Sequence, residues 1–183
     1  MDYHRVYTNM FNNPVYSYHH HIQYDIVPEF IGLSNDTKSL IDIGTGRGQL
    51  LKNISKLNPN FKITSVDLDK FNDLDVEFIN VDLSLKNDRD KLTGKYDFLT
   101  STDVLEHLEE YFIEDVLCLF SRLSDNVIVA IANHSDIQGG IELHTIQRDD
   151  VWWELYINKY FSIINKQTHY DGRLYIYNLK TLV

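Results

Sequence analysis

The sequence alternates between short β-rich runs and stretches of apolar residues at helical spacing. The β-rich runs cover 39–43, 61–66, 76–81, 96–100 and 126–132. Apolar residues recur every three or four positions within 47–57 and 105–123, which predicts amphipathic helices there. Repeated strand–helix units require parallel strands joined by right-handed crossovers, with helices on both faces of the sheet. The alternation therefore predicts an α/β fold.

The last third of the chain predicts how the sheet ends. The run 126–132 (NVIVAIA) is apolar throughout, as in a strand buried on both faces. A loop over 133–147 and a helix over 149–159 follow. Two strands over 161–167 and 173–179 then flank an Asp-Gly pair, which is typical of a hairpin turn. The hairpin predicts one antiparallel strand in an otherwise parallel sheet.

A glycine-rich turn joins the first strand to the first helix. Segment 40–48 (LIDIGTGRG) has glycines at alternate positions, Gly44, Gly46 and Gly48. They permit a tight turn and close approach of a ligand to the backbone. A dinucleotide fingerprint needs its third glycine at position 49, where Gln49 stands. Asp42 would repel a pyrophosphate and suits an ammonium group, so the turn favours a ligand that is cationic at this end.

Two further acids follow the second and third strands. Asp67 comes about twenty residues after the glycine turn, where a carboxylate can accept hydrogen bonds from both ribose hydroxyls. Asp69 is a nearby alternative. Asp82 can accept a hydrogen bond from the exocyclic amine of adenine, and Leu83 can pack on the ring. Acids after the first three strands together predict a nucleoside site at the carboxyl edge of the sheet.

With these residues in place, the chain resembles the class I S-adenosylmethionine-dependent methyltransferases. The resemblance includes the signature Asp103-Val104-Leu105-Glu106-His107 and covers about 39–132. It implies a Rossmann-like three-layer α-β-α sandwich. The implied sheet has seven mostly parallel strands in the order 3-2-1-4-5-7-6, with strand 7 antiparallel.

The resemblance also implies which residues bind S-adenosylmethionine. Asp42 and the glycine backbone would hold the methionine part, Asp67 the ribose and Asp82 the adenine, while residues 100–102 would line the sulfonium. The full set of expected cofactor-binding residues is Asp42, Gly44, Thr45, Gly46, Gly48, Asp67, Leu68, Asp82, Leu83, Thr100, Ser101 and Thr102.

We expect one domain over 1–183, with three parts. A lid or helical segment covers 1–35, including a short helix that ends near Gly32. The cofactor-binding core covers 39–132. The acceptor loop, last helix and terminal hairpin cover 133–183. Trp152 and Trp153 are expected to shape the acceptor pocket, although one of the two is expected to belong to the core.

The expected reaction is methyl transfer to an oxygen or nitrogen of a small molecule or glycan precursor. The donor is already activated, so positioning supplies much of the catalysis, and a hydroxyl acceptor also needs a base. The candidate bases are Asp103, His107, His134 and His144. His134, directly after the fifth strand, is preferred. A structural role for His107 and a surface position for His144 remain open.

No metal is expected. Consecutive His19, His20 and His21 do not converge easily on one ion, and Ala132-Asn133 stands where some relatives carry an Asp-Asn metal pair. Tyr16, Tyr18 and one of these histidines instead suggest a lid over the cofactor. Cys118, in an apolar helical pattern, is expected to be a buried, unreactive thiol.

The charge of the chain bears on its partners. The formal net charge is −10, which disfavours nucleic acid and anionic membranes and leaves a small-molecule acceptor as the expected partner. Residues 1–13 lack the apolar core of a signal peptide, so a cytoplasmic protein is expected.

Two other functions compete with methyl transfer. A lyase or hydrolase can use S-adenosylmethionine on the same fold, and a non-catalytic subunit can bind it as a scaffold for a partner. The glycine spacing and Asp42 disfavour a dehydrogenase.

Overall fold

A seven-stranded sheet forms the centre of the molecule. The computed structural model describes residues 3–12 and 21–182. The strand order is β3-β2-β1-β4-β5-β9-β8, and only the β5–β9 and β9–β8 pairs of this sheet are antiparallel. This confirms the predicted order and the antiparallel seventh strand. Its strands are β1 (Ser39–Ile43), β2 (Lys62–Asp67), β3 (Glu77–Asn80), β4 (Phe98–Thr102), β5 (Asn126–Ala132), β8 (Phe161–His169) and β9 (Leu174–Thr181).

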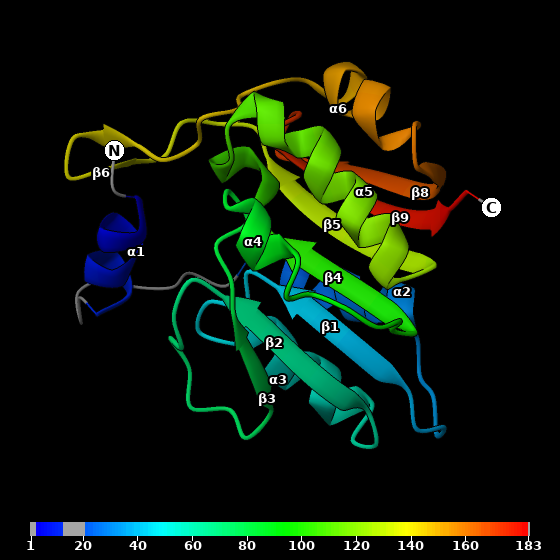
Figure 1. The fold of residues 1–183 in the computed structure, drawn as a ribbon. Coiled ribbons are helices and arrows are strands. Elements are labelled where there is room, and N and C mark those ends of the chain that lie inside the picture. Colours follow the sequence, from blue (N-terminus) through cyan, green and yellow to red (C-terminus); the bar gives the residue numbers. More distant parts are fainter. Residues whose placement is uncertain (1–2, 13–20, 183) are drawn as a thin grey trace.

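Helices cover both faces of this sheet. Figure 1 shows α4, α5 and α6 in front of the sheet and α2 and α3 behind it. The helices are α1 (Tyr3–Asn12), α2 (Gln23–Ile31), α3 (Gln49–Leu57), α4 (Lys86–Arg89), α5 (Ile113–Leu123) and α6 (Asp150–Ile157). Side chains of β1 alternate between the two layers, with Ile41 packed on the α5 side and Leu40 on the α2–α3 side. The three-layer sandwich follows from this alternation.

The helix expected over 105–123 is shorter than the sequence predicts. Two 3₁₀ turns, η1 (Leu105–His107) and η2 (Glu110–Phe112), precede α5. Tertiary contacts explain the difference, because the loop after β5 uses the carbonyls that a helix would need. Ile146 N–H donates to the Glu106 carbonyl (3.0 Å), and the Thr145 hydroxyl donates to the Leu108 carbonyl (2.5 Å).

The loop over 133–147 contains a small hairpin that the sequence did not predict. Its strands are β6 (Ile137–Gln138) and β7 (Ile141–Glu142). In Figure 1 this hairpin and α1 lie at the same side of the molecule, beyond the arrowheads of the parallel strands. Both are therefore placed at the carboxyl edge of the sheet, where open α/β sheets bind ligands.

The short helix before the sheet and the single cysteine show how local residues shape the edges of the fold. α2 ends at Gly32, whose positive φ of 72° and N–H bond to Pro28 close the helix. Cys118 is only partly buried, because it lies at the margin of the buried face of α5. No helix in the described part of the chain has the length and apolar character to cross a membrane.

Candidate functional site

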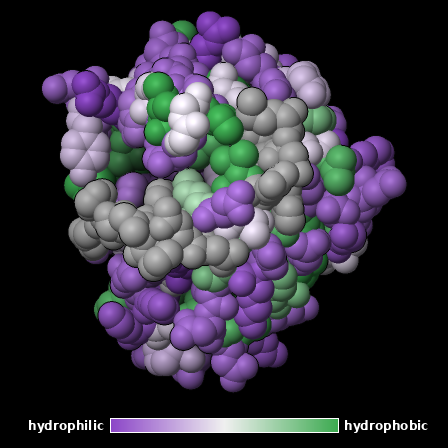
Figure 2. Space-filling view, turned by 90° about the vertical axis from the view of Figure 1, so that its left-hand side faces the viewer, coloured by the Kyte–Doolittle hydropathy of each residue, from purple (hydrophilic) through white to green (hydrophobic). Residues whose placement is uncertain are grey.

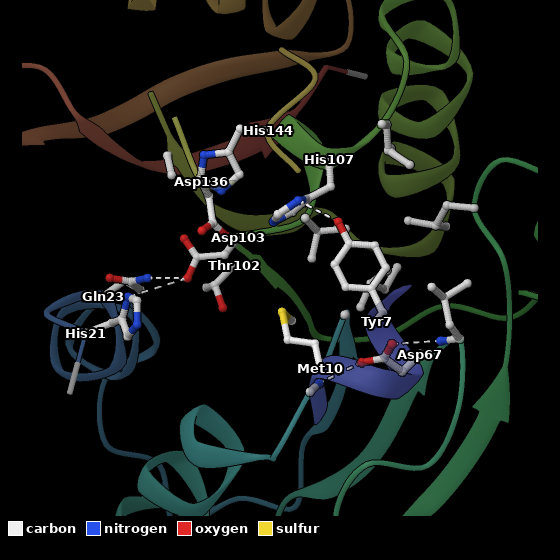
Figure 3. Close-up of a pocket in the computed structure, with 18 of the residues that line it drawn as sticks. Tyr7, Met10, His21, Gln23, Asp67, Thr102, Asp103, His107, Asp136 and His144 are labelled. Carbon is white, nitrogen blue, oxygen red and sulfur yellow. Dashed lines mark hydrogen bonds and ion pairs between the residues drawn. The ribbon is translucent and has the colours of Figure 1, made fainter. Parts of the chain in front are cut away.

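A single large cavity opens at the carboxyl edge of the parallel strands. Its volume is about 960 Å³. That is near the upper end of the usual range for small-molecule sites. Figure 2 views this side of the molecule and shows hydrophobic residues among mainly hydrophilic ones. Figure 3 shows the interior, where Asp67 lies at one end and Asp103, His107 and His144 lie at the other. The cavity therefore joins the predicted cofactor residues to the predicted catalytic residues.

The glycine turn forms part of the cavity wall through Gly44 and Gly46. The Gly44 N–H donates to the Val66 carbonyl (2.8 Å), which fastens the turn to β2. A Cβ atom on Gly44 would lie 2.1 Å from Val104 Cγ2, so the turn packs against the residue after Asp103. Glycine is required here for space and for its φ of 82°.

Asp67 ends β2 and faces the cavity. One carboxylate oxygen accepts the Gly46 N–H (2.7 Å) and the other accepts the Leu68 N–H (2.7 Å). Burial raises the Asp67 pKa to about 6, against the lowering effect of these two hydrogen bonds. Each oxygen keeps a lone pair that a ligand hydroxyl can use. Leu68 also lines the cavity.

Asp82 and Leu83 line the same end of the cavity. Asp82 Oδ1 accepts hydrogen bonds from the N–H (2.8 Å) and the hydroxyl (2.6 Å) of Ser84. These bonds fix the carboxylate at the end of β3. Leu83 is almost fully buried and presents an apolar surface to the cavity, together with Val81.

Five predicted cofactor residues lie behind the cavity wall instead of lining it. They are Asp42, Thr45, Gly48, Thr100 and Ser101, whereas Thr102 does line the cavity. The Asp42 carboxylate accepts the Thr100 hydroxyl (2.7 Å). Burial raises the Asp42 pKa to about 6. In this structure Asp42 supports the turn, and its contact with a ligand stays a prediction.

Three histidines gather at the other end of the cavity. The His107 and His144 ring centroids are 4.6 Å apart, and those of His134 and His144 are 4.9 Å apart. His107 Nδ1 lies 3.0 Å from the Leu143 carbonyl and 2.7 Å from the Tyr7 hydroxyl. His144 Nδ1 lies 2.6 Å from the His134 carbonyl. Burial lowers the pKa of His107 to about 3 and also lowers that of His144, so both rings are neutral at pH 7.

Asp103 stands between these histidines and α2. Its φ of 54° turns the chain sharply at the end of β4. The carboxylate accepts a hydrogen bond from Gln23 Nε2 (2.5 Å) and lies 3.9 Å from His21 Nδ1 (Figure 3). Burial raises the Asp103 pKa, and nearby His21 opposes the rise. Its position suits either a proton acceptor or an anchor for a cationic group.

The N-terminal helix also contributes to the cavity, through Tyr7, Met10 and Phe11. In Figure 3, Tyr7 and Met10 lie between Asp67 and the histidines. Sequence reasoning missed these three residues, although apolar and aromatic residues recur at the spacing of one helical face: Tyr3, Val6, Tyr7, Met10 and Phe11. It also missed Gln23, Asp136 and Arg173, since tertiary folding alone brings them to the cavity. Of the expected lid residues, Tyr16, Tyr18, His19 and His20 lie outside the described residues.

The expectation that Trp152 and Trp153 shape the acceptor pocket is wrong, whereas the expectation that one of them belongs to the core is confirmed. Trp153 is fully buried in the core and Trp152 packs against it, so neither lines the cavity. Both lie on α6, which covers the front face of the sheet and not its carboxyl edge (Figure 1).

Comparison with known proteins gives a family match. A family model described as a methyltransferase domain matches residues 18–171. No curated protein matches the sequence.

Many solved structures share the fold. A protein from Pyrococcus horikoshii matches with a TM-score of 0.68 at 15% identity, over 100% of this chain and 99% of that one. The N-methyltransferase NodS from Bradyrhizobium japonicum, solved with S-adenosylhomocysteine, matches with a TM-score of 0.68 at 10% identity, over 100% of both chains. Human N-acetylserotonin methyltransferase, solved with S-adenosylmethionine, matches with a TM-score of 0.64 at 15% identity, over 88% of this chain and 52% of that one. At these identities the likeness shows a shared fold.

Proposed function

The chain belongs to the methyltransferase-domain family, and on that basis we propose that it methylates an oxygen or nitrogen of a small molecule or glycan precursor. S-adenosylmethionine is its methyl donor. The observation that carries the proposal is one cavity of about 960 Å³ that reaches from Asp67 and Asp82 to Asp103 and His134. It has room for a nucleoside-sized cofactor and a small acceptor together.

The residues at the Asp67 end fit this cofactor. Asp67 offers acceptor oxygens to the ribose hydroxyls, and Asp82 offers an oxygen to the adenine amine. Leu68 and Leu83 provide apolar surface for the ring. Gly44 and Gly46, which have no side chains to fill the cavity wall, would lie against the methionine part. When bound, the cofactor supplies a methyl group on a sulfonium, whose electron pair stays on sulfur as the carbon–sulfur bond breaks.

The histidine end is proposed to bind and activate the acceptor. His134 follows β5 and lines the cavity, and its Nδ1 lies 3.1 Å from the Ser135 carbonyl. No described residue bonds to its Nε2, so this nitrogen is open to take a proton from an acceptor. The proposed base is therefore His134, with Asp103 as the alternative carboxylate base.

Calorimetric titration with S-adenosylmethionine and S-adenosylhomocysteine tests the cofactor assignment. We expect micromolar binding to the wild type and a loss of at least about tenfold in Asp67→Ala, because a charge-assisted hydrogen bond is worth about 1.5–3 kcal/mol. Asp69→Ala is the matched control, since Asp69 is exposed and does not line the cavity. Absence of binding of either ligand to folded wild-type protein would overturn the proposal.

A further inference from the structure

Glu106 is fully buried, and one of its carboxylate oxygens has no partner in the described structure. The other oxygen, Oε1, accepts the Ala132 N–H at 2.7 Å. A buried carboxylate with an unpaired oxygen is costly, because nothing replaces the water that it loses on folding. Glu106 Oε2 is therefore open to a further hydrogen-bond partner or a cation.

Two histidines stand where such a cation would bind. Glu106, His107 and His144 each offer one ligand atom, and these three atoms all lie within 4.8 Å of one another. Neighbouring ligands of a tetrahedral Zn²⁺ ion, each about 2.1 Å from the metal, lie about 3.4 Å apart. Closing the site therefore needs the ligand atoms to approach one another by up to about 1.4 Å, which rotation of the three side chains would supply.

The hydrogen bonds of both histidines leave the correct nitrogen free. The Leu143 carbonyl can only accept, so a proton on His107 Nδ1 satisfies the contact at 3.0 Å, and the Tyr7 hydroxyl, 2.7 Å from the same nitrogen, then serves as a second acceptor. The His134 carbonyl likewise places a proton on His144 Nδ1, at 2.6 Å. Each ring then has its Nε2 lone pair available, and no described residue bonds to either Nε2. Ligating histidines in proteins are typically oriented in this way by a backbone carbonyl.

We propose that Glu106, His107 and His144 bind one divalent transition-metal ion, such as Zn²⁺, at the wall of the cavity. Two imidazoles and one carboxylate favour such an ion over Mg²⁺, which prefers oxygen ligands. Ala132 N–H would orient the carboxylate from the outer shell. The cation would also offset the charge of Asp103, which lies beside this group (Figure 3).

Three protein ligands leave a coordination position open towards the cavity, which His107 and His144 both line. This step rests on the proposed function: the open coordination position would take a hydroxyl oxygen of the methyl acceptor. Metal binding lowers the pKa of such a hydroxyl, so its proton can pass to His134. The oxygen lone pair then forms the bond to the methyl carbon as the carbon–sulfur pair returns to sulfur. The acceptor class narrows to a hydroxyl compound.

The test is titration of metal-free, tag-free protein with Zn²⁺ and with Co²⁺, whose visible absorption reports its ligands. We expect one equivalent to bind, with Mg²⁺ much weaker. Glu106→Gln keeps the acceptor for Ala132 N–H and removes the charge. Glu106→Gln and His144→Ala should each lose more than the 10- to 100-fold that an outer-shell partner is worth. The matched control His169→Ala should bind as the wild type does, because His169 lies outside the cavity.

Two outcomes would overturn the proposed metal site. One is the absence of saturable binding to folded wild-type protein, and the other is binding that Glu106→Gln leaves unchanged. Circular dichroism shows whether each variant is folded. S-adenosylhomocysteine titration of the metal-free protein separates the two proposals, because cofactor binding without metal binding would overturn the metal site alone.

Discussion

His134 is the histidine whose removal should separate catalysis from binding. Its ring is exposed, and its Nδ1 bonds only to the neighbouring Ser135 carbonyl, so His134→Ala disturbs little of the fold. Loss of a general base lowers kcat by about 10²- to 10⁴-fold. Affinity for S-adenosylhomocysteine should stay within about twofold, because Asp67 and Asp82 lie at the other end of the cavity (Figure 3).

The measurement for His134→Ala is steady-state turnover with an acceptor found by screening, beside calorimetric titration of the cofactor product. His169→Ala should behave as the wild type in both. An unchanged kcat in His134→Ala would mean that Asp103 is the general base or that the acceptor reacts without a general base.

Gly44 is the glycine whose replacement should be most damaging. A methyl group there would lie 2.1 Å from Val104 Cγ2, and the φ of 82° is strained for any other residue. Overpacking of this kind costs about 1–3 kcal/mol in the free energy of unfolding. Gly139→Ala is the control, because Gly139 also has a positive φ, 58°, but no atom within 4 Å of the new methyl group.

Urea unfolding of the two glycine variants measures this difference. Gly139→Ala reports the backbone strain alone, and the excess loss in Gly44→Ala reports the contact with Val104. Equal destabilisation would mean that Val104 can move away at little cost and that the turn is less rigid than its contacts suggest.

At the scale of elements, α1 covers the cavity without belonging to the core. The Phe11 ring stacks on Phe71, with centroids 4.4 Å apart, and the Phe11 carbonyl accepts a hydrogen bond from Arg47 (2.9 Å). Tyr7 bonds to His107 across the cavity (2.7 Å). No residue of α1 is a member of either described core cluster. The helix can therefore serve as a lid that is removable in an experiment.

Deletion of residues 1–12 should weaken S-adenosylhomocysteine binding about tenfold, mainly through faster dissociation, and leave the unfolding midpoint nearly unchanged. Stopped-flow dissociation and thermal unfolding measure the two effects. The milder variant Tyr7→Phe removes only the hydroxyl bonded to His107. A dissociation rate equal to that of the wild type would show that α1 does not cover the bound cofactor.

For the whole molecule, two buried carboxyls predict how stability changes with pH. Burial raises the pKa values of Asp42 and Asp67 from 3.8 to about 6, so the folded state binds protons that the unfolded state has released. Their stabilising effect is complete below about pH 4 and is lost as the pH rises through about 6. A shift of about two units corresponds to at most about 3 kcal/mol for each group, and to less for Asp67, which is partly exposed.

Denaturant unfolding between about pH 4 and pH 7 measures this effect. Asp42→Asn keeps an acceptor for the Thr100 hydroxyl and has no charge to bury, so its stability should exceed that of the wild type increasingly as the pH rises. Asp36→Asn, at an exposed position, is the control and should follow the wild type. Parallel curves for wild type and Asp42→Asn would contradict the raised pKa.

The sheet could be predicted from the sequence because strand and helix periods are local properties. The apolar run of β5, the glycine turn and the Asp171-Gly172 hairpin can each be predicted from neighbouring residues alone. The 3₁₀ turns after β4 could not be predicted, since Thr145 and Ile146 from a later loop take their carbonyls. The predicted division into lid, core and acceptor region stays a prediction.

The candidate site was predictable at its cofactor end and less so at its acceptor end. Asp67 and Asp82 stand directly after strands, where parallel topology places them at one edge. Glu106 was visible in the signature beside His107, but its unpaired oxygen and its distance from His144 are tertiary properties. The cavity residues of α1 follow a helical apolar spacing in the sequence, but that spacing does not show which surface the helix covers.

The pairing of β5 with β9 also bears on how the chain reaches its native state. β9 pairs with every residue of β5, from Asn126↔Lys180 to Ala132↔Leu174. Residues 133–173 lie between the two strands in the chain. During synthesis, the backbone N–H and C=O groups on one edge of the apolar strand β5 therefore stay unpaired until β9 has left the ribosome. An open apolar edge recruits other chains. A chain truncated before Leu174 should thus aggregate on expression instead of accumulating as a smaller domain.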